Sequence, residues 1–66
     1  MEYLPHQQRV VDEANELWVK LEALKTFIDS NSMFSTLDIM ERQRLTKQMW
    51  AMELYQDVLV ERIENF

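Results

Sequence analysis

The side chains best suited to chemistry lie near the two ends of the chain, and they suit the binding of an anion. Guanidinium groups hold phosphate oxygens through paired hydrogen bonds, imidazole and amide groups add further donors, and a phenol ring stacks on a base. The residues of these types are His6, Gln8, Arg9, Tyr55 and Arg62. We predict them as ligand-binding residues of a fold that brings the start and end of the chain together.

A structural interpretation of the same residues stays open. Arg9 precedes Glu13 by four positions, a spacing that forms ion pairs on a helix. Arg62 can likewise pair with acids on a neighbouring helix. A helix that begins near Pro5 favours the anion site, because its first N–H groups lack partners and carry the positive end of the helix dipole.

The chain offers no catalytic set and no metal site. Cysteine is absent, and the single histidine, His6, has no serine or cysteine partner at nucleophile spacing. Glu13 and Glu16 lie three positions apart, as do Glu61 and Glu64, but the Glu-x-x-His partner of carboxylate-bridged metal bundles is missing. We therefore expect a protein that is not an enzyme and needs no metal ion or cofactor.

Composition limits the class of protein. The chain has 66 residues, no glycine, one proline and 47% apolar residues, which is typical of one small helical domain. Its net charge of −5 disfavours general nucleic-acid binding. No apolar run approaches the roughly 20 residues of a membrane span. The first residues lack the pattern of a signal peptide, so we expect a soluble, intracellular protein with no membrane partner.

The elements that must position these side chains are two helices. Apolar residues recur at steps of three and four along residues 5–30, and again along residues 36–65. A polar stretch at about 31–35 separates them, with Ser35 or Thr36 as candidate caps of the second helix. The sequence predicts an all-α fold, a two-helix antiparallel hairpin forming one domain over 1–66, with Met33 and Phe34 folded back to plug its end.

More apolar rows are present than one hairpin can bury. The additional positions are Val11, Trp18, Leu21, Trp50, Leu54 and Val58. We predict that they form the interface of a homo-oligomeric helical bundle, since a chain this short has little core of its own. The loop half carries most of the basic side chains and the terminal half most of the acids, so antiparallel pairing of hairpins places unlike charges together. The alternative is an apolar patch for a different protein.

Three segments carry a resemblance to a known group of proteins. They are Pro5-His6-Gln7-Gln8-Arg9-Val10-Val11-Asp12-Glu13; Phe27-Ile28, Phe34, Leu37 and Glu41-Arg42; and Met52-x-x-Tyr55-x-x-Val58-Leu59-x-x-Arg62-Ile63. Across about residues 5–66 the chain resembles the very short, uncharacterised phage and prophage proteins related to a crAss-like phage protein. The resemblance implies a phage-encoded accessory protein that acts in the cytoplasm of the infected bacterium.

An analogy of architecture extends this expectation. Some other tiny phage proteins, built as oligomeric helical hairpins, bind the nucleotide signals of bacterial defence and keep them from their effectors. We therefore expect a non-enzymatic homo-oligomer that sequesters a cyclic nucleotide or an ADP-ribose derivative. The alternative is a protein–protein interaction module that adapts or inhibits a host or phage protein through Trp18 and Trp50, with no small-molecule ligand.

Overall fold

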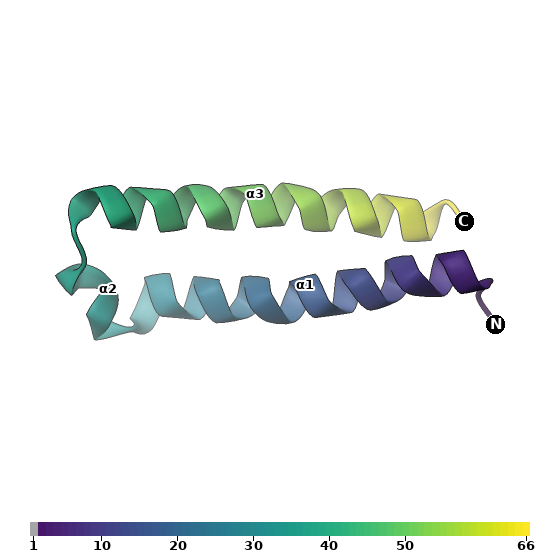
Figure 1. Ribbon diagram of the computed structural model, residues 1–66, viewed down its shortest axis with the longest axis horizontal. Helices are drawn as coiled ribbons and strands as arrows, with labels where there is room; N and C mark the ends of the chain where they lie inside the picture. Colours follow the sequence, from purple (N-terminus) through teal and green to yellow (C-terminus); the bar gives the residue numbers. More distant parts are fainter. Residues whose placement is uncertain (1) are drawn as a thin grey trace.

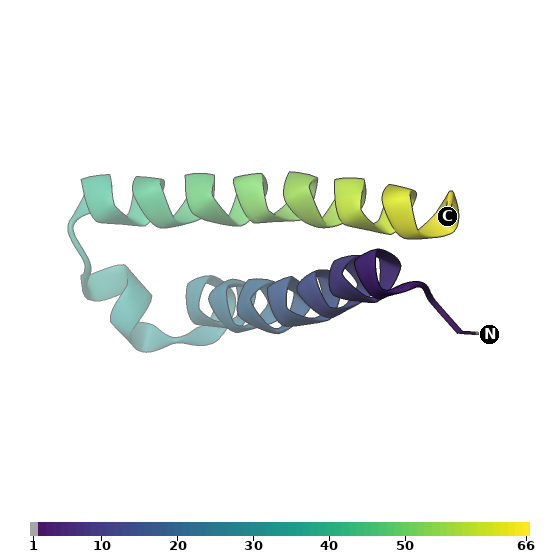
Figure 2. The same cartoon turned by 45° about the vertical axis from the view of Figure 1, so that its right-hand side comes forward.

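The computed structural model describes residues 2–66 and shows an antiparallel helical hairpin (Figure 1). Its elements are α1 (Pro5–Ser30), α2 (Ser32–Thr36) and α3 (Ile39–Glu64), and no strand occurs among the described residues. The molecule measures 46 × 16 × 14 Å. Figure 2 shows α2 at the end where the chain reverses, remote from both termini. The prediction of an all-α hairpin is confirmed, and its assembly into an oligomer stays a prediction.

Local chemistry sets the limits of α1. Pro5 occupies the first helical position, where its missing N–H is not needed. The N–H of Leu4 donates to Oε1 of Gln7 at 2.9 Å, which fastens the first turn. At the other end Asn31 adopts an extended conformation (φ −89°, ψ 123°) and interrupts the helix. α1 therefore occupies the range expected from its apolar stripe.

The connection differs from the expected loop and second-helix start. Oδ1 of Asn31 accepts from the N–H of Met33 at 2.8 Å and begins α2. The hydroxyls of Ser35 and Thr36 donate back to carbonyls of that same short helix, so neither caps α3. Asp38 is the cap, and its Oδ2 accepts from the N–H of Met40 at 3.1 Å. The expected start near residue 36 was therefore wrong, and α3 begins at Ile39.

The predicted plug at the loop end is formed by one of its two residues. Phe34 is half-buried and meets Phe27 edge to face, with ring centroids 6.1 Å apart. Met33 is exposed and does not contribute to the plug. Phe34 thus joins α2 to the end of α1.

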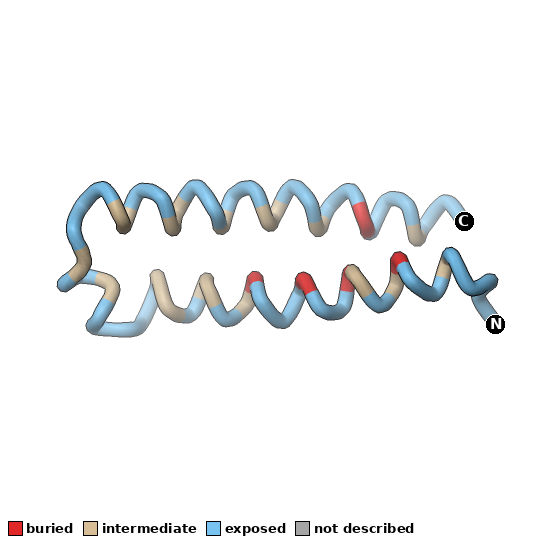
Figure 3. Tube along the Cα trace, in the orientation of Figure 1, coloured by how far each residue is buried: buried red, intermediate tan, exposed pale blue. Residues whose placement is uncertain are grey.

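The core lies in the half of the hairpin that contains the termini (Figure 3). Val10, Ala14 and Leu17 of α1 pack with Leu59 of α3, which is 1% exposed. An edge-to-face contact between Tyr3 and Phe66, 5.7 Å between centroids, covers the open end. The buried side chains of the described residues are those of Val10, Ala14, Leu17, Leu21 and Leu59, and of these Leu59 is fully buried. Beyond Leu21, the loop half is therefore held by partly buried side chains.

The cap at Asp38 gives a prediction of stability. Asp38→Ala removes the acceptor of the Met40 N–H, and we expect it to lower the free energy of unfolding by about 0.5–2 kcal/mol. Urea titration followed by far-UV circular dichroism measures the loss. Asp29→Ala is the matched control, because Asp29 is exposed in the last turn of α1, where a carboxylate is unfavourable. Equal losses in the two variants would contradict the capping role.

Candidate functional site

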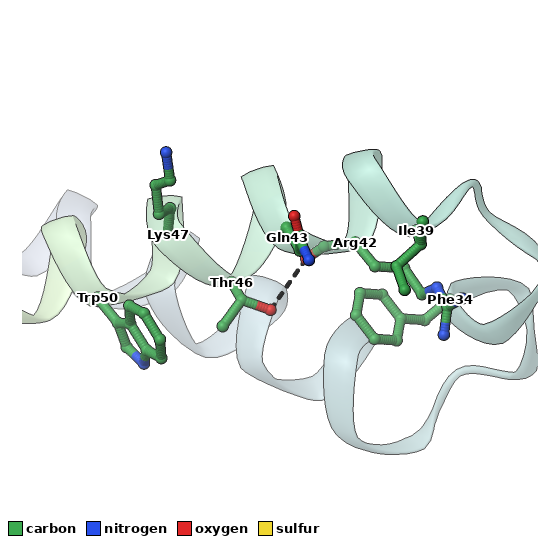
Figure 4. A pocket seen from close by; sticks show the side chains of 7 residues that line it. All are labelled: Phe34, Ile39, Arg42, Gln43, Thr46, Lys47 and Trp50. Atoms are coloured by element: carbon green, nitrogen blue, oxygen red, sulfur yellow. Dashed lines mark hydrogen bonds between the residues drawn. The ribbon is translucent and has the colours of Figure 1, made fainter.

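A groove lies at the loop end of the hairpin. Its volume is about 480 Å³. The lining residues come from α2 and from the first half of α3: Phe34, Ile39, Arg42, Gln43, Thr46, Lys47 and Trp50. Figure 4 shows Phe34 beside Arg42 and Ile39 at one end, Trp50 at the other end, and Thr46 between them. We refer to this surface as the loop-end groove.

The spacing of residues on α3 produces the groove. Arg42, Thr46 and Trp50 follow one another at intervals of four, so they share one face of the helix. Phe34 arrives from α2 because the short helix folds back against the end of α1. The Thr46 hydroxyl donates to the carbonyl of Arg42 at 2.9 Å, so it is engaged within α3. One helix face and one aromatic ring thus enclose the space.

The electrostatics of the groove centre on Arg42. Its Nε atom is buried and has no hydrogen-bond partner within residues 2–66. Neighbouring Arg44 differs, because its Nε donates to Oε1 of Glu41 at 2.8 Å in an ion pair. A buried donor without a partner is unfavourable by about 1–3 kcal/mol, so a rearrangement of the Arg42 side chain that brings its guanidinium to an acceptor is favoured.

The groove joins flat aromatic surface to positive charge. The indole of Trp50 and the phenyl ring of Phe34 present faces on which a planar ring can stack. Arg42 offers N–H donors in a fixed plane that matches phosphate or carboxylate oxygens. Lys47 extends away from the rings at the rim and adds a second positive charge. The arrangement is suited to a ligand that is both aromatic and anionic.

The predicted ligand-binding residues lie outside the loop-end groove. His6, Arg9 and Arg62 are exposed at the end of the hairpin near the termini, and Tyr55 is partly exposed on α3. Gln8 donates from Nε2 to Oδ1 of Asp12 at 2.9 Å, so its amide is already engaged. Within residues 2–66 no hydrogen bond or ion pair joins any two of these side chains.

The alternative role of Arg9 was an ion pair with Glu13 on the same helix. No Arg9–Glu13 ion pair occurs among the described residues, so this alternative receives no support. The two arginines share one end of the hairpin, as the antiparallel topology requires. They remain a candidate cluster without a described cavity.

The sequence interpretation missed the loop-end groove. The sequence places Trp50 in a predicted interface and gives Arg42 and Lys47 no binding role. The four-residue spacing of Arg42, Thr46 and Trp50 was the available signal. The sequence predicted that Phe34 folds back onto the end of the hairpin, but not that it lines a groove with α3, because this depends on a short helix that the polar connection did not reveal.

The predicted interface residues differ in how far the single hairpin buries them. Trp18, Trp50, Leu54 and Val58 are exposed, and Val11 is half-buried. The prediction that Leu21 belongs to the oligomer interface was wrong. Leu21 is buried in the seam of the single hairpin and is not available to a second chain.

A notch of about 140 Å³ beside Leu21 is lined by residues of both long helices. They are Trp18, Leu21, Lys25, Glu53, Gln56 and Asp57. Oε1 of Gln56 is buried without a partner there. Gln56 takes the place of an apolar residue in the stripe of α3, which explains why the seam is less tightly packed at this point.

The described residues hold no metal-binding group and no membrane-spanning helix. Among residues 2–66 no group of three His, Cys, Asp or Glu side chains is arranged to hold a metal ion. None of the described helices combines the length and the apolar character needed to cross a membrane.

The fold and the groove define a small helical-hairpin protein with an exposed concave surface. Comparison with models of protein families gives a narrower class. Residues 4–65 match the family described as Sequestin, and the chain belongs to that family. It is 35% identical over 63 residues to a protein of Enterobacteria phage T4 described as "Uncharacterized 7.5 kDa protein in denB-rIIB intergenic region". That match covers 96% of this chain and 97% of the phage protein. No solved structure matches the chain.

Proposed function

We propose that this protein is a phage-encoded, non-enzymatic accessory protein that binds and sequesters a small nucleotide-derived signal of host immunity. The family name Sequestin denotes sequestration, and the T4 relative supports a phage setting. The signal is a cyclic nucleotide or an ADP-ribose derivative. We place its binding site in the loop-end groove, in place of the cluster around Arg9 and Arg62 that the sequence first suggested.

The observation that carries this proposal is the unpartnered Nε of Arg42 in a groove that also contains Trp50. A base stacks on the indole, and base–aromatic stacking contributes about 1–3 kcal/mol. A phosphate oxygen accepts from the Arg42 guanidinium, and Lys47 adds attraction from the rim. Both parts of a nucleotide therefore have a partner in one groove.

The groove also supports binding without catalysis. The residues that line it include no carboxylate, histidine or thiol, and its hydroxyl, on Thr46, is already bonded to a backbone carbonyl. A general base and an activated nucleophile are both missing from the lining. A sequestering protein needs neither, because it lowers the free concentration of the signal by mass action alone.

The proposal includes self-association and a cellular setting. We place the protein in the cytoplasm of the infected bacterium, where immune nucleotides are produced. We also propose that it works as a homo-oligomer, since Trp50, Leu54 and Val58 leave a large apolar surface uncovered on a single hairpin.

A second function class is favoured by a specific observation. Trp18 is 52% exposed and Trp50 is 62% exposed, and exposed tryptophans are frequent anchors of protein–protein interfaces. The alternative is therefore an adaptor or inhibitor that docks on another protein through these side chains and binds no small molecule.

Native mass spectrometry of the full chain, with cyclic dinucleotides and ADP-ribose as probes, tests the proposal. We expect a stoichiometric gain of one probe mass per groove. Tryptophan fluorescence then locates the site: Trp18→Phe leaves Trp50 as the reporter, and Trp50→Phe leaves Trp18. Quenching by the probe in the first variant alone supports the loop-end groove. A protein that stays empty across the panel would contradict the proposal and favour the adaptor.

A further inference from the structure

One side of α3 faces away from the hairpin and carries a row of exposed apolar side chains. Trp50 is 62%, Leu54 67% and Val58 44% exposed. They lie on the side of α3 opposite Leu59, which is buried against α1. Lys47 precedes this row and Glu61 follows it, at the helical spacing that keeps all five on one face. We refer to these five residues as the outer face of α3.

The outer face of α3 is self-complementary when two copies run antiparallel. Leu54 is its midpoint, because Trp50 and Val58 lie equally far from it in sequence, as do Lys47 and Glu61. We infer that two copies of this chain pair through this face about a two-fold axis at Leu54. Trp50 of each copy then packs on Val58 of the other, and Lys47 lies opposite Glu61, twice per dimer.

The charges select this orientation over a parallel one. In a parallel pair Lys47 would face Lys47 and Glu61 would face Glu61, and like charges at these positions repel. In the antiparallel pair both ends of the apolar row are closed by opposite charges. Neither Lys47 nor Glu61 forms an ion pair within residues 2–66, so both are free to meet a second copy. Charge complementarity and spacing therefore point to the same arrangement.

The dimer involves two residues of the loop-end groove. Lys47 and Trp50 belong both to the outer face of α3 and to the loop-end groove. Pairing engages the ammonium of Lys47 with a carboxylate of the second copy and packs part of the Trp50 indole on Val58 of that copy. Arg42 takes no part in the pairing and is the groove cation that remains for an anion. Assembly should therefore depend on Lys47, and anion binding on Arg42. The inferred dimer does not require that any ligand exists.

Exchanging the charges at positions 47 and 61 tests the inference. The dissociation constant of the dimer is measured by analytical ultracentrifugation. Lys47→Glu and Glu61→Lys each place two like-charge pairs in the dimer, and we expect about tenfold weaker dimerisation for each. The double variant Lys47→Glu/Glu61→Lys recreates two opposite pairs and should restore the wild-type dissociation constant. Lys20→Glu and Glu16→Lys make the same charge changes at exposed positions of α1 and should leave it unchanged.

A substitution at Leu54, the midpoint of the outer face of α3, gives a second test. Leu54→Glu brings two carboxylates together at the two-fold axis, and we expect a monomer that retains its helical circular dichroism. Wild-type protein that stays monomeric at high concentration would overturn the inference. A dimer that survives Leu54→Glu would overturn it as well. Failure of the double charge exchange to recover dimerisation would show that the antiparallel register is wrong.

Discussion

Arg42→Ala is expected to weaken binding of a nucleotide probe by about 10- to 150-fold. Hydrogen bonds to charged groups contribute about 1.5–3 kcal/mol, and this range corresponds to that loss of affinity. The guanidinium supplies the buried Nε donor that lacks a partner in the free protein, so no internal bond is broken by its removal. Isothermal titration calorimetry with the probe identified by mass spectrometry measures the change.

Arg44→Ala is the matched control for this substitution. It removes the same side chain and the same charge two positions away, but Arg44 is engaged by Glu41 at 2.8 Å. We expect at most a twofold change, since the charge lost is already largely balanced. Equal weakening by both variants would contradict a specific role for Arg42. A loss of helicity in Arg42→Ala would point to a structural role instead.

The same titration separates the two candidate sites. Arg9→Ala and Arg62→Ala remove the arginines of the terminal cluster, where no described cavity lies, and we expect near wild-type affinity from each. If either abolishes binding while Arg42→Ala does not, the ligand sits at the terminal end, as first predicted from the sequence. The loop-end groove would then be a surface feature.

Leu59→Ala is expected to lower the free energy of unfolding by about 2–5 kcal/mol. Leu59 is the one fully buried side chain that α3 contributes among the described residues, and it packs against Val10, Ala14 and Leu17. At roughly 0.05–0.15 kcal/mol per residue, such a loss is a large part of the stability of a chain this short. Urea denaturation at one fixed protein concentration measures it, because self-association also contributes to apparent stability.

A pair of identical substitutions on α1 controls for helix propensity. Val10→Ala and Val19→Ala delete the same atoms, but Val10 is 7% exposed and Val19 is 67% exposed. We expect a loss of about 1.5 kcal/mol for Val10→Ala and no loss for Val19→Ala. Similar effects at both positions would show that the core does not hold the hairpin together.

The fold was largely predictable because it depends on the spacing of apolar residues along the chain. The apolar stripe of α1 and the proline at its start indicate both the helix and its bounds, and two long amphipathic helices with a short polar connection favour a hairpin. The connection was not predictable in detail. Ser35 and Thr36 have side chains typical of caps, yet they bond backward into α2, and Asp38 begins α3. Competing local hydrogen bonds of similar strength decide such boundaries.

The candidate site was harder to predict than the fold. Sequence reasoning grouped Arg9, Arg62 and Tyr55 because an antiparallel hairpin brings its ends together, and that topology is present. Proximity alone does not create a concave surface, however. The loop-end groove needs a ring from α2 standing beside one face of α3, and periodicity carries no information about where a five-residue helix turns its phenylalanine.

The position of the core near the termini has a consequence for how the molecule is made. Val10 and Leu59 are separated by almost the whole hairpin, so α1 is synthesised long before the residue that covers its apolar stripe. Among the described residues, none near the connection is buried to a comparable degree, so no equivalent core holds the two long helices together earlier. Closure therefore waits until most of α3 has left the ribosome, and the nascent α1 spends that interval with its apolar side exposed to the cell.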